Sequence, residues 1–146
     1  YISDQVMGGV SQGQLQFEQQ GDEEYARMTG RVSTENNGGF IQFRKKIEKG
    51  ATESALGVYL RVRGNSEGYF VHLRTAGTLL PWQYYQASFK PTDDWQVIKL
   101  PLTDFAKSSS WLRSTVKADA IRSIAVVAFG KDYEAEIDVA EIGFYD

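Results

Sequence analysis

Hydrophobic and polar residues alternate along most of this chain, and the alternation predicts β-strands. The clearest example is the segment 55–64, in which every second residue is aliphatic: Leu56, Val58, Leu60 and Val62. Successive side chains of a strand point to opposite faces, so this segment should bury one face and expose the other. The segment 69–74 repeats the pattern, with its apolar positions at Tyr69, Val71 and Leu73.

Seven further segments have the composition of short strands: 14–18, 26–32, 40–47, 83–89, 96–100, 121–129 and 134–145. The turn-forming residues of 64–68 predict a hairpin between the two strands that flank them. The run 36–39, Asn-Asn-Gly-Gly, supplies the positive-φ residues of a second tight hairpin. Helix is confined to single turns over 103–107, with Thr103 as the cap, and over 118–120.

About nine short strands, separated by glycine, asparagine, serine and aspartate, predict an all-β fold with minimal helix. The arrangement that suits them is an antiparallel β-sandwich. The chain has 146 residues, which is enough for one core and predicts a single domain over 1–146. No repeat of 20–50 residues is present, which argues against a solenoid or a propeller.

Composition excludes several classes of function. Sixteen Lys and Arg against nineteen Asp and Glu give a net charge of −3, which does not favour nucleic acid as a partner. No apolar run approaches the roughly 20 residues of a membrane span. Cysteine is absent and His72 is the only histidine, so thiolate catalysis, disulfides and a His-pair metal site are excluded within one chain. The chain begins at Tyr1 rather than Met, which indicates a trimmed N-terminus, and the lack of a visible signal favours the cytoplasm.

Two patterns resemble catalytic or metal sites. The segment 9–13 matches the G-x-S-x-G nucleophile elbow, but it lacks the preceding hydrophobic strand and the following helix, so a glycine-rich turn is the better interpretation. The acidic residues lie mainly in turns and at strand ends, as solvated charges do. A structural calcium site remains an alternative if Asp4 meets the C-terminal acids. We therefore expect no enzyme activity and no cofactor.

One face of the expected central strands has the chemistry of a binding surface. Its residues are Tyr59, Arg61, Arg63, Phe70, His72 and Arg74, and the next strand adds either Tyr84, Gln86 and Ser88 or Tyr85, Ala87 and Phe89. Guanidinium groups bind carboxylates, phosphates and hydroxyls, and aromatic rings stack on flat surfaces. We take as candidate contact residues Tyr59, Arg61, Arg63, His72, Arg74, Tyr84 and Gln86. The alternative is an ordinary solvent-exposed sheet face whose arginine stems cover apolar area.

The tryptophans and the histidine fit this interpretation. Trp82 and Trp111 fall in loop-like segments that could form the rim of such a face, whereas Trp95 suits the core or the start of a strand. A lone histidine can act as a general base, but His72 has no evident nucleophile to activate.

The chain also resembles a known family. Its segment 4–11, Asp-Gln-Val-Met-Gly-Gly-Val-Ser, resembles the D-x-V-M-G-G-V-S signature of the complex I intermediate-associated protein family. Further landmarks follow in family order: 30–33, 36–40, 60–64, Tyr69, 73–74, 95–97, 100–102 and Phe105. The segment 64–66 reads Gly-Asn-Ser where the family commonly has Gly-Asp-Gly, so a carboxylate is missing from that turn.

The resemblance implies a galactose-binding-domain-like jelly roll and a non-catalytic domain. Its eukaryotic members resemble assembly chaperones of a respiratory complex, which implies a protein partner. The alternative function is a carbohydrate-binding module that holds a saccharide on the same basic and aromatic face.

Overall fold

The computed structural model describes residues 1–3, 9, 11–35, 39–80 and 82–146. Eleven strands lie in this part of the chain: β1 (Ile2–Ser3), β2 (Gln12–Gln20), β3 (Glu23–Val32), β4 (Phe40–Lys46), β5 (Gly57–Gly64), β6 (Tyr69–Thr75), β7 (Tyr85–Phe89), β8 (Gln96–Pro101), β9 (Ala106–Lys107), β10 (Ile121–Phe129) and β11 (Tyr133–Tyr145). Two 3-10 turns, η3 (Leu102–Asp104) and η4 (Ala118–Ala120), precede β9 and β10. Within the described ranges no helix is long and apolar enough to cross a membrane.

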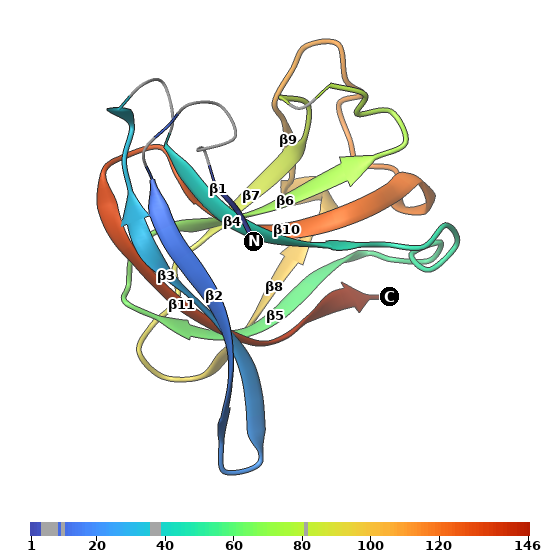
Figure 1. Cartoon of the computed structure of the whole chain (residues 1–146). Coiled ribbons are helices and arrows are strands. Elements are labelled where there is room, and N and C mark those ends of the chain that lie inside the picture. The colour runs from blue at the N-terminus through green and yellow to red at the C-terminus, as the bar shows by residue number, and fades with distance from the viewer. Residues whose placement is uncertain (4–8, 10, 36–38, 81) are drawn as a thin grey trace.

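The strands form two antiparallel sheets that pack face to face (Figure 1). The six-stranded sheet has the order β1-β4-β10-β6-β7-β9, and the five-stranded sheet has the order β2-β3-β11-β5-β8. Most neighbours in each sheet are far apart in the sequence, so the chain repeatedly crosses between the sheets, as it does in a jelly roll. The expected all-β jelly-roll sandwich is confirmed.

The core lies between the inner faces of the two sheets, where the alternating apolar positions meet. Val58, Leu60 and Val62 on β5 are fully buried, as are Tyr69, Val71 and Leu73 on β6. Leu56, which the alternation assigned to the same face, is 64% exposed. The reason is that β5 begins only at Gly57, and Leu56 lies in the connection before it.

Both expected hairpins are wrong. β5 belongs to the five-stranded sheet and β6 to the six-stranded sheet, so residues 64–68 form a crossover between sheets. Backbone hydrogen bonds hold this crossover, from Gly64 N to Thr92 O (2.7 Å) and from Asn65 N to Glu136 O (3.1 Å). Likewise β3 and β4 lie in different sheets, and residues 36–38 are outside the described part of the chain.

Short local elements agree only partly with expectation. The turn at 118–120 is present, and the other expected turn is a 3-10 turn over Leu102–Asp104. Thr103 lies inside this turn and does not cap it, because the N-cap position is Pro101 and no side chain caps it. A true hairpin joins β2 to β3, where Gly21 has a φ of 62° that favours glycine.

Candidate functional site

The candidate contact residues fall on two opposite faces of the sandwich. Tyr59, Arg61 and Arg63 project from the outer face of β5, in the five-stranded sheet. His72, Arg74, Tyr84 and Gln86 belong to the outer face of the six-stranded sheet, on or directly before β6 and β7. The inner faces of the sheets pack against each other, so these outer faces point away from one another. The expectation of one continuous surface is therefore wrong, and its cause is the false hairpin at 64–68.

The structure shows which residues of β7 face the core and which face outward. Tyr85, Ala87 and Phe89 are buried in the core, so Tyr84, Gln86 and Ser88 face outward. β6 and β7 pair with His72 directly opposite Gln86. This pairing brings four of the seven candidate residues together on one face.

We call the resulting surface the β6–β7 platform and define it by Phe70, His72, Arg74, Tyr84, Gln86 and Phe129. The rings of His72 and Tyr84 stack at 4.0 Å between centroids with 12° between their planes. Phe129 on β10 meets His72 edge-on at 5.4 Å, and Phe70 lies 4.6 Å from Phe129. The aromatic contacts are therefore continuous across three neighbouring strands.

Polar groups fix the orientation of the β6–β7 platform. Nε2 of His72 lies 3.2 Å from Oε1 of Gln86, a contact in which the Nε2–H tautomer donates to the amide oxygen. The Arg74 guanidinium donates to the backbone oxygen of Gln83 (3.0 Å) and lies 5.9 Å from the Tyr84 ring centroid. Arg74, Tyr84 and Gln86 are half-buried, so they combine a fixed position with access from outside.

Electrostatics make the platform histidine neutral. The pKa of His72 is lowered to about 4, mainly by burial; the Gln86 hydrogen bond raises it in part, and the nearby Arg74 and Arg44 cations contribute to the lowering. Burial is also the main reason that the pKa of Arg74 is lowered. At neutral pH the platform therefore presents an uncharged imidazole beside an arginine, and such an imidazole is a weak general base.

Two of the other three candidate residues, Arg61 and Arg63, belong to a cluster with its own partners, which we call the β5 arginine cluster. Its members are Arg27, Arg61, Arg63, Tyr25, Trp95 and Asp138. Asp138, which is 5% exposed, accepts a hydrogen bond at 2.8 Å from Nε of Arg27 and another at 2.8 Å from Nε of Arg63. Arg61 pairs with Glu23. These guanidinium groups are thus already held by carboxylates of the chain itself.

Aromatic rings complete the β5 arginine cluster. The Trp95 ring, directly before β8, lies 4.8 Å from the Arg61 guanidinium and 4.6 Å from that of Arg63. Tyr25 meets Trp95 edge-on at 5.5 Å. Tyr59 lies against Gly143 of the neighbouring strand β11, where a Cβ would come within 3.0 Å of its ring. These contacts account for the cluster and for Tyr59 as parts of the fold.

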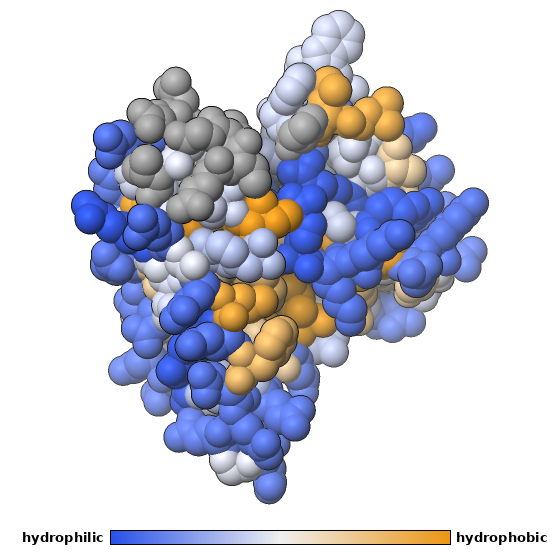
Figure 2. All heavy atoms as spheres, viewed as in Figure 1, coloured by the Kyte–Doolittle hydropathy of each residue, from blue (hydrophilic) through white to orange (hydrophobic). Residues whose placement is uncertain are grey.

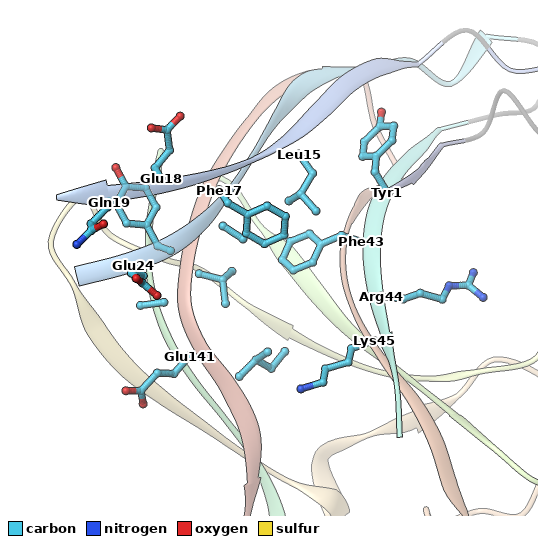
Figure 3. Close-up of a pocket in the computed structure, with 15 residues that line it drawn as sticks. Tyr1, Leu15, Phe17, Glu18, Gln19, Glu24, Phe43, Arg44, Lys45 and Glu141 are labelled. Carbon is cyan, nitrogen blue, oxygen red and sulfur yellow. The ribbon is translucent and has the colours of Figure 1, made fainter. Parts of the chain in front are cut away.

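A hollow lies elsewhere in the described part of the chain, at an open edge of the sandwich. It has a volume of about 690 Å³ and lies between β2, β3 and β11 on one side and β4 on the other. Leu15, Phe17 and Phe43 point toward one another inside it, and Tyr1 lies nearby (Figure 3). It appears beside β2 as a hydrophobic patch (Figure 2). None of the candidate contact residues lines this hollow. Sequence reasoning missed the hollow because it forms where the edges of the two sheets separate, and the pattern within a single strand does not predict that separation.

The structure describes the serine of the G-x-S-x-G match but not the Asp4 of the calcium alternative. Ser11 of the G-x-S-x-G match is fully buried; its hydroxyl donates to Ser33 O (3.1 Å) and accepts from Ser33 N (2.8 Å). Val10 and Asp4 lie outside the described residues, so the calcium alternative that involves Asp4 is untested. Among the residues that are described, no three His, Asp or Glu side chains gather into a metal site.

Comparison with solved structures gives carbohydrate-binding modules. The family 11 carbohydrate-binding module of the cellulosomal cellulase Lic26A-Cel5E of Clostridium thermocellum superimposes with a TM-score of 0.76 at 13% identity, covering 94% of this chain and 83% of that one. The same organism's family 11 module in complex with a β-1,3-1,4-mixed-linked tetrasaccharide gives 0.75 at 13%, covering 94% and 84%. A family 30 carbohydrate-binding module gives 0.62 at 11%, covering 94% and 92%. At these identities the likeness shows the fold alone.

Comparison by sequence identifies the family. No curated protein matches the chain. Residues 1–135, however, match the profile of the family described as Complex I intermediate-associated protein 30 (CIA30). The match covers nearly the whole chain and confirms the resemblance carried by the segment 4–11 and the landmarks after it. This chain belongs to the CIA30 family.

Proposed function

We propose that this chain is a non-catalytic binding domain that holds a protein partner against the β6–β7 platform, as an assembly factor of a respiratory complex would. The family points to an assembly role, since its description refers to intermediates of complex I. The observation that carries the proposal is the buried His72 ring stacked on the half-buried Tyr84, with the half-buried Arg74 beside them on a sheet face.

The chemistry of the β6–β7 platform suits a protein contact. Tyrosine and arginine are the residues that dominate binding energy at protein interfaces, because each combines apolar area with a hydrogen-bonding group. Here the stacking of Tyr84 on His72 and the bond from Arg74 to Gln83 O restrain both side chains before binding. A restrained side chain loses little entropy on binding, so more of the contact energy is expressed as affinity.

The same geometry supports a role without catalysis. His72 contacts an amide rather than a hydroxyl, and its lowered pKa of about 4 makes it a poor base at neutral pH. The Arg74 cation and aromatic rings match a partner that offers carboxylates, carbonyl groups and flat apolar surface.

Affinity purification from cells that assemble complex I tests the proposal. The tagged chain should co-purify with complex I subunits, and the Arg74→Ala, Tyr84→Ala double variant should lose at least about nine-tenths of that signal, since each residue of a binding hot spot contributes about 2 kcal/mol. The matched control is Arg31→Ala, because Arg31 is an exposed arginine on β3 of the other sheet. Equal recovery of these subunits by the wild type and the double variant would contradict the proposal.

A saccharide is the second candidate, because the solved structures with a similar fold include a module in complex with a mixed-linked tetrasaccharide. The Tyr84 face and the neighbouring Phe129 provide rings on which a sugar could stack. Calorimetric titration with that β-1,3-1,4-linked tetrasaccharide separates the two functions. Binding that is lost in Tyr84→Ala, without recovery of complex I subunits, would favour the saccharide.

A further inference from the structure

A second exposed feature lies at one end of the sandwich, next to the β6–β7 platform, whose Tyr84 ends one of its two loops. Four large apolar or aromatic side chains project from two loops, 76–84 and 108–117: Leu79, Leu80, Trp82 and Trp111. Leu79 is 83% exposed and Trp111 is 90% exposed. We call these four residues the loop tip. Both loops lie together beside β7 and β9 (Figure 1), and hydrophobic residues gather at this end of the surface (Figure 2).

Hydrogen bonds hold the two loops side by side. The Ser108 hydroxyl donates to Trp82 O (2.7 Å) and accepts from Tyr84 N (2.9 Å), and Ser108 N donates to Tyr84 O (2.8 Å). The buried side-chain oxygen of Gln83 accepts from Leu79 N (2.9 Å) and Leu80 N (3.0 Å). The leucines therefore project from a closed turn that the chain itself stabilises.

Within the two loop segments the charged residues are all positive, and Asp104 and Asp119 lie just beyond the ends of the second segment. The segments 75–84 and 106–117 contain Lys107, Arg113 and Lys117 and no Asp or Glu, within a chain of net charge −3. All three cations are exposed. Phe17, which is 82% exposed at the open edge of the sandwich, has charges of both signs around it, since Glu18, Glu24, Arg44 and Lys45 line the same hollow.

We propose that the loop tip docks this domain on an anionic lipid surface, with the leucines and tryptophans inserted at the level of the headgroups. Tryptophan favours the interface between membrane and water, and exposed leucine gains free energy by leaving water. Cations beside the inserted residues attract anionic lipids. A saccharide would explain exposed tryptophans, but a Leu79–Leu80 pair has no ring to stack on a sugar. The docking surface is peripheral, because its loop side chains reach only the level of the headgroups.

Vesicle sedimentation tests this proposal. The whole chain is mixed with vesicles of phosphatidylcholine alone or of phosphatidylcholine with phosphatidylglycerol. It should sediment with the anionic vesicles, and the Leu79→Ser, Trp111→Ser double variant should bind at least about tenfold more weakly. Phe17→Ser, the matched control at an exposed apolar residue away from the loops, should bind like the wild type. Raising the salt concentration should weaken binding, because it screens the cations.

Tryptophan fluorescence gives a second readout that does not depend on a loss of binding. Trp82 and Trp111 lie in the loop tip, whereas Trp95 is half-buried in the β5 arginine cluster. Lipid brominated on its acyl chains should quench emission of the wild type on anionic vesicles and quench Trp82→Phe, Trp111→Phe much less. No sedimentation with anionic vesicles, or sedimentation unchanged in the serine double variant, would overturn the proposal. The proposal would also be overturned if the chain did not bind vesicles but bound the tetrasaccharide in a way that depends on Trp111.

Discussion

Replacing Asp138 by asparagine tests the assignment of the β5 arginine cluster to the stability of the fold. Asp138 is 5% exposed on β11 and joins Arg27 of β3 to Arg63 of β5 through two bonds of 2.8 Å. Asparagine keeps the shape but removes the charge, and it leaves two guanidinium groups side by side without their carboxylate. Asp138 is also the main reason that the pKa of Arg27 is raised.

The magnitude follows from burial. Removing one partner of a buried ion pair costs about 3–5 kcal/mol, because it strands the other charge. The Arg27 and Arg63 side chains are 33% and 22% exposed, so water compensates part of this cost. We therefore expect Asp138→Asn to lower the free energy of unfolding by about 2–3 kcal/mol.

Urea denaturation followed by circular dichroism measures this change, with Asp93→Asn as the control at an exposed aspartate next to the same surface. The control should change the free energy of unfolding by less than about 0.5 kcal/mol. A value for Asp138→Asn as small as that of the control would refute the reasoning. The arginines would then be free to bind a ligand, as the sequence pattern first suggested.

Two further predictions concern a titrating group and a close backbone contact. The folded pKa of His72, about 4, lies below its ordinary value of 6.5, so the unfolded chain binds the extra proton first and stability falls as the pH drops from about 6.5 towards 4. Between pH 7 and pH 4.5 the wild type should lose about 2 kcal/mol more unfolding free energy than His72→Gln, and equal losses in the two proteins would refute this. A Cβ at Gly30 would collide with the backbone of Gln12 and Gly13, so Gly30→Ala should destabilise by about 1–3 kcal/mol in thermal or urea unfolding. Gly68→Ala, where a Cβ would meet open space, is its control, and equal stability of the two variants would show that the strands adjust at no cost.

Local patterns predicted the strands well, because a strand that buries one face has apolar residues at every second position. All nine expected segments are strands, from the segment 55–64 to the segment 134–145, although most boundaries differ by one or more residues. The strands that sequence missed, β1 and β9, have two residues each, which is too short for alternation to show. The family resemblance also held, since it rests on motifs spread over the whole chain.

The pairing of the strands was beyond local patterns. Turn residues at 64–68 look the same whether the chain folds back within a sheet or crosses to the other one. The partner of β5 is decided by β11, whose Asp138 opposes Arg63 across 75 positions of sequence. The predicted single binding surface was wrong for the same reason. Arg61 and Arg63 lie on β5 in one sheet, whereas His72 and Arg74 lie on β6 in the other. The burial of His72 likewise depends on its contact with Phe129 of β10, and the sequence around residue 72 does not predict that contact.

The central claim is that one outer face of the sandwich, the β6–β7 platform, contacts the partner and the other does not. Its most direct test compares two double variants, one on each face, for the amount of complex I subunits that they co-purify. Arg74→Ala, Tyr84→Ala removes the platform side chains, and Tyr59→Ala, Lys99→Ala removes side chains of neighbouring strands on the five-stranded sheet. We predict that the first variant loses about nine-tenths or more of the recovered subunits and the second recovers them like the wild type. Full recovery by the platform variant together with loss in the other would contradict the account.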